Sequence, residues 1–190
     1  MKIAVVESDP GRAREIIDAL KEDGWQDVVV LGDVIGLARK LSALNPDLVL
    51  IDLANPSRDA LEQISAASDA QSRPVAMFVD HSDDEMTQAA VTAGLSAYVG
   101  GALQPERIRP VLKTAIARFQ MMSQMRLELE AAKQALADRK TVDRAKGMVM
   151  RARGISEEEA YALIRKTAMS QNRKVIEAAQ ALLTASDLLS

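Results

Sequence analysis

The chain has 190 residues, of which 48% are hydrophobic and 27% are charged, a composition typical of globular domains rather than of disordered or fibrous chains. It contains no cysteine and a single histidine, which excludes disulfides, thiol catalysis, thiolate metal sites and histidine metal clusters. The N-terminal segment reaches a carboxylate at Glu7 and lacks the features of a signal peptide. No segment approaches the roughly 18 apolar residues of a membrane span. We therefore expect a cytoplasmic protein of one or two domains, without membrane contact.

Charge is distributed unevenly along the chain. Residues 1–118 carry 12 Lys and Arg against 18 Asp and Glu, a net charge of −6. Residues 119–190 carry 12 against 9, a net charge of +3, and residues 139–174 alone carry 10 against 4. This asymmetry predicts two modules, the second with nucleic acid as a candidate partner. A solvated helical surface is the alternative explanation of the basic segment.

The first 118 residues alternate short apolar runs with helical patterns. Uninterrupted apolar runs suit strands that are covered on both faces. The predicted strands are Ile3–Val6, Asp27–Leu31, Leu48–Asp52, Val75–Val79 and Ala97–Gly100. The predicted helices are Gly11–Asp23, Asp33–Leu44, Asp59–Ser68, Asp83–Ala93 and a segment from Pro105 onward. This alternation predicts an α/β domain over residues 1–118 with a five-stranded, parallel, doubly wound sheet, whose working site lies at the carboxyl ends of the strands.

A long helix is predicted from Arg107, because no proline follows Pro110 and the next glycine is Gly147. Its apolar residues recur at spacings of four and three, which is typical of a coiled coil. Over residues 107–138 we predict a coiled-coil linker that pairs with a second copy of the chain, with packing against the chain's own first domain as the alternative. The residues predicted at the dimer contact are Leu112, Phe119, Met122, Leu129 and Leu136.

The last segment, residues 136–190, is predicted to form a unit of three helices. Ser156 can cap the second helix, with Glu159 completing a capping box. Tyr161 keeps helical register with Ile164 and is predicted to lie in the core of this unit, with stacking on a nucleic-acid base as the alternative.

Asp52 ends the third predicted strand, where a carboxylate can accept a phosphoryl group. This chemistry also requires acidic ligands for Mg²⁺ and cationic or hydroxyl groups that hold the phosphate. Glu7 and Asp9 end the first strand, and together with Asp52 they are the candidate Mg²⁺ ligands. In the alternative interpretation, Asp52 only caps the turn that follows it.

Several segments of this first part resemble a two-component receiver domain: VVESDP, LVLIDLANP, AGLSAYV and LQPERI. The resemblance implies a flavodoxin-like fold and aligns Asp52 with the phosphorylated aspartate and Glu7 with the first acidic position. Three positions depart from the receiver pattern: Ser8 replaces the second acid, Val79 replaces a Thr or Ser, and Gly101 replaces a Lys. A phosphorylated receiver and a receiver controlled by a partner protein therefore both stay open.

The last segment resembles an ANTAR domain, the RNA-binding antitermination module of bacterial regulators, from Leu136 to Leu183. Its specific marks are AKG followed by a methionine, SEEEAY, RKTAM and QNRK. The resemblance implies a three-helix bundle that binds a pair of stem-loops in a leader transcript and prevents a terminator from forming. Cations are expected on phosphates, and amides on the edges of loop bases. The predicted RNA-binding residues are Arg139, Lys140, Arg144, Lys146, Arg165, Lys166, Gln171, Asn172, Arg173 and Lys174.

Within this family the receiver is most similar to nitrate-assimilation antiterminators of the NasT type, through FVDHSD, AGLSAYV and LQPERIRPVLKTAIARF. This implies control of nitrate or nitrite assimilation genes and a nitrate- or nitrite-sensing partner protein that sequesters the regulator. A histidine kinase is the other candidate partner.

Two alternatives come from other functional classes. One is a DNA-binding response regulator whose tail is a helix-turn-helix, and the other is a receiver-linked scaffold that binds only protein. We expect no enzyme activity and predict no catalytic residue, because the sequence shows no nucleotide-binding glycine loop and no paired acid and base.

Overall fold

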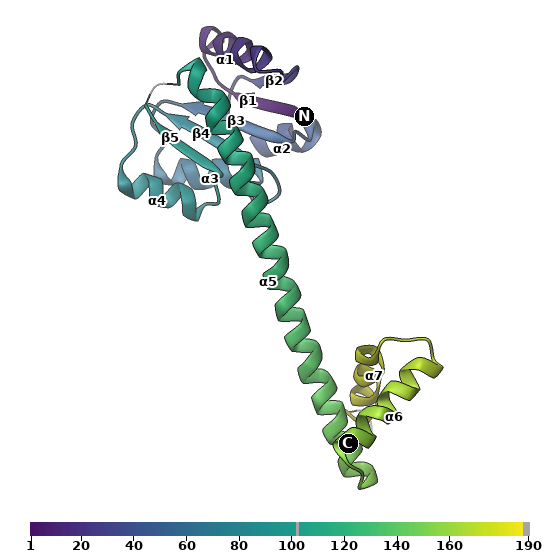
Figure 1. The fold of residues 1–190 in the computed structure, drawn as a ribbon. Coiled ribbons are helices and arrows are strands. Elements are labelled where there is room, and N and C mark those ends of the chain that lie inside the picture. Colours follow the sequence, from purple (N-terminus) through teal and green to yellow (C-terminus); the bar gives the residue numbers. More distant parts are fainter. Residues whose placement is uncertain (102, 188–190) are drawn as a thin grey trace. The chain divides into compact units, whose positions relative to one another are not determined.

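The computed structural model of the protein describes residues 1–101 and 103–187 (Figure 1). Ala102, in the GGALQP segment, and the last three residues of the predicted 136–190 domain lie outside the described residues. The chain forms two compact units, Met1–Gln124 and Met125–Ser190.

The first unit is built on a five-stranded parallel sheet in the order β2-β1-β3-β4-β5. The strands are β1 (Lys2–Val6), β2 (Asp27–Leu31), β3 (Leu48–Leu53), β4 (Val75–Val79) and β5 (Ala97–Gly100). Leu48–Ile51 of the central strand β3 are fully buried, as expected for a parallel strand covered on both faces. The predicted parallel sheet is confirmed, and the residues that follow β1, β3 and β4 lie at one edge of it.

Helices cover both faces of this sheet (Figure 1). They are α1 (Pro10–Glu22), α2 (Leu37–Leu44), α3 (Arg58–Ser68), α4 (Asp84–Thr92) and the first part of α5 (Pro105–Arg153). One core cluster joins the sheet to α1 and α5 through residues such as Ile16 and Ile108. A second cluster joins it to α2, α3 and α4 through Leu41, Leu61 and Ala90. The doubly wound arrangement is therefore confirmed.

Helix α2 begins four residues later than predicted, at Leu37 instead of Asp33. The Asp33 carboxylate accepts a hydrogen bond from the Ile35 N–H at 2.9 Å and pairs with Lys40 Nζ at 2.7 Å. Gly36, directly before the helix, has a φ of 65°, a left-handed conformation that glycine adopts without strain. These contacts form a turn in place of the first predicted helical turn.

Part of the predicted coiled-coil face of α5 belongs to the core of the first unit. Ile108, Leu112 and Ala115 are fully buried and pack against the sheet. The prediction that Leu112 contacts a second chain is therefore wrong, because the spacing of apolar residues does not reveal what covers them. Further along α5, Leu129 and Leu136 are each 55% exposed.

Neither α5 nor any other helix in the described part of the chain is apolar enough over a sufficient length to cross a membrane.

The second unit joins the end of α5 to α6 (Glu157–Ser170) and α7 (Val175–Asp187). Its core is rich in alanine, which lets the helices approach one another closely: Ala145, Val149, Ala160, Ile164, Ala168, Ala178 and Ala179. The predicted capping box begins α6. The Ser156 hydroxyl accepts the Glu159 N–H at 3.3 Å, and the Glu159 carboxylate accepts the Ser156 N–H at 2.9 Å.

Tyr161 does not lie in this core. Its side chain is 43% exposed, so the prediction of a core position is wrong. The buried line of α6 runs through Ala160, Ile164 and Ala168, at a spacing of four residues, and Tyr161 is one position away from that line.

Candidate functional site

Three acidic side chains lie at the carboxyl edge of the sheet. Glu7 directly follows β1, Asp52 belongs to the end of β3, and Asp80 directly follows β4. Glu7 is 6% exposed and Asp52 is 3% exposed. A buried carboxyl group is either paired with a positive group or neutralised by a proton, because burial removes the water that stabilises its charge. The sequence predicts Glu7 and Asp52 at this site but not Asp80, for which the position after a strand is the only signal.

The positive partner is Arg12, in the first turn of α1. Its Nη2 lies 2.7 Å from Oδ2 of Asp52, its Nε 3.7 Å from Oε2 of Glu7, and its Nη1 4.0 Å from Oδ1 of Asp80. No other Lys or Arg in the described part of the chain pairs with these carboxylates. The role of Arg12 is not visible in the sequence, because a local pattern does not determine where a long flexible side chain reaches.

Asp9 has a local structural role. Its carboxylate accepts the Arg12 N–H at 2.7 Å and caps α1, and its own N–H donates to Oε1 of Glu7 at 2.7 Å. Within residues 1–101 and 103–187, no three His, Cys, Asp or Glu side chains are arranged to hold a metal ion. The three predicted Mg²⁺ ligands thus have protein partners in the structure: Arg12 pairs with Glu7 and Asp52, and Asp9 caps a helix.

Burial raises the pKa of Asp52 to about 7, and the adjacent Glu7 carboxyl contributes to this rise while Arg12 opposes it. An aspartate in an unfolded chain has a pKa of about 3.9. Between these two values the folded chain binds a proton at Asp52 that the unfolded chain has released. The contribution of Asp52 to folding stability is therefore greatest below pH 4, falls as the pH rises to about 7, and stays constant above that.

We expect Asp52→Asn to remove this pH-dependent loss. From pH 5 to pH 8 the unfolding free energy of the wild type should fall by about 1 kcal/mol or more relative to that of the variant. Urea unfolding at both pH values measures this difference. Asp18→Asn is the matched control, since Asp18 is exposed on α1. An Asp52→Asn variant with the same pH dependence as the wild type would contradict the raised pKa.

The side chains that complete a receiver site are absent at the three positions that the sequence identifies. Val79 is 1% exposed at the end of β4 and offers no hydroxyl, and Ser8 is exposed. Gly101 has a φ of 98°, and its N–H donates to the Asp80 carbonyl at 3.2 Å. A lysine would be strained in this conformation, so the backbone at this position favours glycine.

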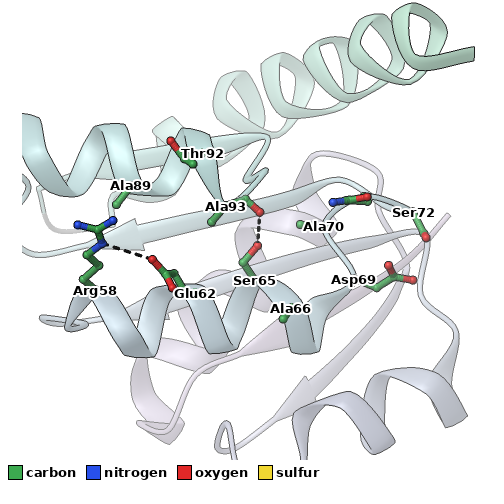
Figure 2. Close-up of a pocket in the computed structure, with 11 residues that line it drawn as sticks. Arg58, Glu62, Ser65, Ala66, Asp69, Ala70, Ser72, Ala89, Thr92 and Ala93 are labelled. Atoms are coloured by element: carbon green, nitrogen blue, oxygen red, sulfur yellow. Dashed lines mark hydrogen bonds and ion pairs between the residues drawn. The ribbon is translucent and has the colours of Figure 1, made fainter. Parts of the chain in front are cut away.

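A separate hollow lies between α3 and α4 (Figure 2). Arg58 pairs with Glu62 at 3.3 Å, and the Ser65 hydroxyl donates to the Ala93 carbonyl at 2.6 Å. None of the predicted site residues lines this hollow. Its polar groups link neighbouring turns and helices, so the hollow is explained by packing between α3 and α4.

The predicted RNA-binding cations of the second unit fall into two groups. Lys146 is held by Asp143 at 2.7 Å and by Glu157 at 2.6 Å, and only 15% of its side chain is exposed. These ion pairs raise the pKa of Lys146 and link α5 to α6. Arg139 also pairs with Asp143, at 3.9 Å. The geometry therefore gives Lys146 a structural role, and its contact with RNA stays a prediction.

The other cations are exposed and form no ion pair among the described residues: Lys140, Arg144, Arg165, Lys166, Arg173 and Lys174. Four of them, Arg165, Lys166, Arg173 and Lys174, lie on the last turns of α6 and in the segment between α6 and α7, and we call them the α6–α7 cations. The exposed amides Gln171 and Asn172 lie in the same segment, where Asn172 has a φ of 51°.

An apolar surface adjoins these cations on α6. Tyr161, Arg165 and Met169 recur at every fourth residue and therefore lie on one face of the helix. Together with Lys166 they line a shallow hollow, in which Met169 is 71% exposed. An aromatic ring and a thioether beside unpaired cations can bind a nucleobase and its phosphates. The spacing in the sequence indicates that these residues share a helix face, but only the structure shows that Tyr161 is exposed.

The two units correspond to known domains. Residues 130–183 match the ANTAR domain. The first unit has the receiver fold: chemotaxis protein CheY4 of Vibrio cholerae superposes with a TM-score of 0.51 at 16% identity, over 60% of this chain and 97% of that one. The chain therefore joins a domain with the receiver fold to a segment that matches the ANTAR domain.

Two curated relatives are similar to this chain. The transcriptional regulatory protein PdtaR of Mycobacterium tuberculosis is 24% identical over 182 residues, which cover 96% of this chain and 89% of PdtaR. The nitrate regulatory protein of Klebsiella oxytoca is 40% identical over 63 residues, which cover 33% of this chain and 16% of that protein.

Proposed function

We propose that the protein is a response regulator that acts as an RNA-binding transcription antiterminator, whose ANTAR domain binds paired stem-loops in leader mRNA. The single observation that carries the proposal is the group of α6–α7 cations, which are exposed and unpaired within the ANTAR domain. Cations that are free of carboxylate partners can neutralise phosphates without first breaking an ion pair. The neighbouring Gln171 and Asn172 supply donors and acceptors for unpaired loop bases.

The exposed surface around Tyr161 and Met169 supports RNA in preference to duplex DNA. Unpaired bases in a loop can stack on an aromatic side chain, whereas the bases of a duplex are already stacked on one another. In addition, α6 begins with three acidic residues, Glu157, Glu158 and Glu159, which would repel the phosphates that border the major groove.

Control of nitrate or nitrite assimilation is the regulatory role that we propose. Its support is the local identity of 40% to a nitrate regulatory protein. We further propose that the receiver domain takes its signal from a nitrate- or nitrite-sensing protein that sequesters the regulator, instead of from a histidine kinase. Support for this comes from Val79 and Gly101, which lack the hydroxyl and the ammonium group that would hold a phosphoryl group at Asp52.

We propose that the protein is a homodimer held by the exposed apolar residues of α5. Met125, Leu129 and Leu136 are 56%, 55% and 55% exposed, and they recur at intervals of four and seven residues, so one helix face presents them. Met122, at 43% exposed, precedes them on α5, as does the partly buried Phe119. An apolar helix face that is open to water is stabilised when the same face of a second copy covers it.

RNA and DNA binding can be compared directly in solution. The purified protein is titrated with a leader RNA of two stem-loops, with the same RNA carrying one mutated loop, and with duplex DNA of equal length, each over a salt series. We expect tight binding to the paired stem-loops that is lost when one loop is changed. Equal, weak and salt-sensitive binding to both RNAs and to the DNA would show that the ANTAR surface binds polyanions without specificity. This result would favour the alternative of a scaffold that binds only protein.

A further inference from the structure

The acidic site of the receiver domain contains its own cation. The side chains of Glu7, Asp52 and Asp80 come from the ends of three neighbouring strands, and the guanidinium of Arg12 lies 2.7–4.0 Å from an oxygen of each. A guanidinium carries a permanent positive charge and five N–H donors. One side chain of the chain itself thus supplies positive charge to all three carboxylates.

The fold determines where Arg12 points. Asp9 caps α1 through the Arg12 N–H, which fixes the first turn of the helix. Ala13, Ile16 and Leu20 are buried against the sheet at spacings of three and four residues, and this fixes the rotation of α1 about its axis. Arg12 then begins next to the acidic site, within reach of the three carboxylates.

The residues do not fit a divalent cation while Arg12 is present. Oδ2 of Asp52 is the buried oxygen that faces Arg12, and it has no hydrogen-bond partner, so the ion pair with Arg12 is its polar contact. A metal ion at Glu7 and Asp52 would have to displace the guanidinium and would then lie beside its positive charge. Asp9, the third predicted ligand, is used as a helix cap.

We infer that Arg12 replaces the divalent cation of this receiver domain: it stabilises the buried carboxylates without metal and prevents a metal ion from binding to them. The acidic site is then complete as folded, and its state does not depend on the supply of Mg²⁺. This inference concerns the receiver domain alone and does not depend on RNA binding by the ANTAR domain.

The test compares the full-length wild type with Arg12→Met, and with Arg14→Met as the matched control on an exposed position of the same helix. Thermal unfolding is followed in EDTA and in 10 mM Mg²⁺, and Mn²⁺ binding is measured by electron paramagnetic resonance. We expect the wild type and Arg14→Met to have the same Tm in both buffers and to bind no Mn²⁺. We expect Arg12→Met to have a lower Tm in EDTA, to gain about 4–8 °C in Mg²⁺ and to bind one Mn²⁺.

A second comparison separates charge from packing. In EDTA, Arg12→Met combined with Asp52→Asn should recover most of the Tm that Arg12→Met loses, because the removal of one carboxylate replaces the missing cation. The double variant also keeps the test decisive if Arg12→Met alone does not fold. The inference is overturned if the wild type binds one Mn²⁺ as tightly as Arg12→Met does, or if the double variant recovers no stability.

Discussion

Replacing the four α6–α7 cations with glutamine is expected to weaken binding to a two-stem-loop RNA by at least 100-fold at 150 mM salt. The slope of log K against log salt is negative, and each lost phosphate contact lowers its magnitude by about 0.7. The paired variants Arg165→Gln/Lys166→Gln and Arg173→Gln/Lys174→Gln should therefore each reduce the slope by about 1.4, as measured by fluorescence anisotropy over a salt series. Circular dichroism verifies that each variant is folded.

The matched control for charge loss is Lys133→Gln with Arg58→Gln. Neither residue is among the predicted RNA-binding residues, and both already pair with carboxylates, Lys133 with Glu130 at 2.8 Å and Arg58 with Glu62 at 3.3 Å. Their loss changes the net charge as much as each α6–α7 pair does, but it should leave the salt slope unchanged. If the control reduces the slope as strongly as the α6–α7 pairs do, the contacts with phosphate are not confined to the unpaired cations.

Leu129→Glu combined with Leu136→Glu is expected to convert the protein from a dimer to a monomer. Each substitution places a carboxylate in an apolar contact between two helices, where it faces the same carboxylate of the other copy. We expect the dimer dissociation constant to rise by at least 100-fold, since two such charges must be desolvated in each chain. Size-exclusion chromatography with light scattering measures the mass over a concentration series.

Leu127→Glu is the matched control for this experiment. Leu127 is 68% exposed, more than either Leu129 or Leu136, but it lies two residues from Leu129 and so points away from that helix face. The control variant should stay dimeric. A wild type that is monomeric at micromolar concentration, or a Leu127→Glu variant that dissociates as readily as the double variant, would exclude this helix face as the dimer contact.

The strands could be predicted from the sequence because their burial is visible in it. Leu48–Ile51 and Val75–Val79 form uninterrupted apolar runs, which are typical of strands covered on both faces. The start of α2 was harder to predict, because the hydrogen bond of Asp33 and the left-handed Gly36 make a turn within a segment whose apolar spacing is helical. Local hydrogen bonds of this kind override periodicity at the ends of helices.

Which residues of an apolar helix face are buried could not be predicted from the sequence. Leu112 and Leu129 share one spacing pattern on α5, yet Leu112 is fully buried by the first unit and Leu129 is 55% exposed. The same limit applies to Tyr161, whose register resembles that of Ile164 although only Ile164 is buried. Periodicity shows that a helix has an apolar face, whereas the tertiary fold decides which residues of that face are covered.

The candidate site was predicted in part for a related reason. Glu7 and Asp52 follow from the rule that the ends of parallel strands meet at one edge. Arg12 could not be predicted, because its role depends on the distance from α1 to carboxylates on three strands. Similarly, the sequence groups Lys146 with the other cations, but Asp143 and Glu157 become its partners only when α5 and α6 pack together.

Transcription in vitro through a leader terminator tests the central claim most directly. The template encodes two stem-loops upstream of the terminator, and the fraction of full-length transcript is measured with increasing protein. We expect the wild type to raise read-through several-fold, and we expect no rise when one loop is mutated or when the four α6–α7 cations are replaced. If the protein binds the intact leader RNA tightly but does not raise read-through on it, antitermination is contradicted as its function.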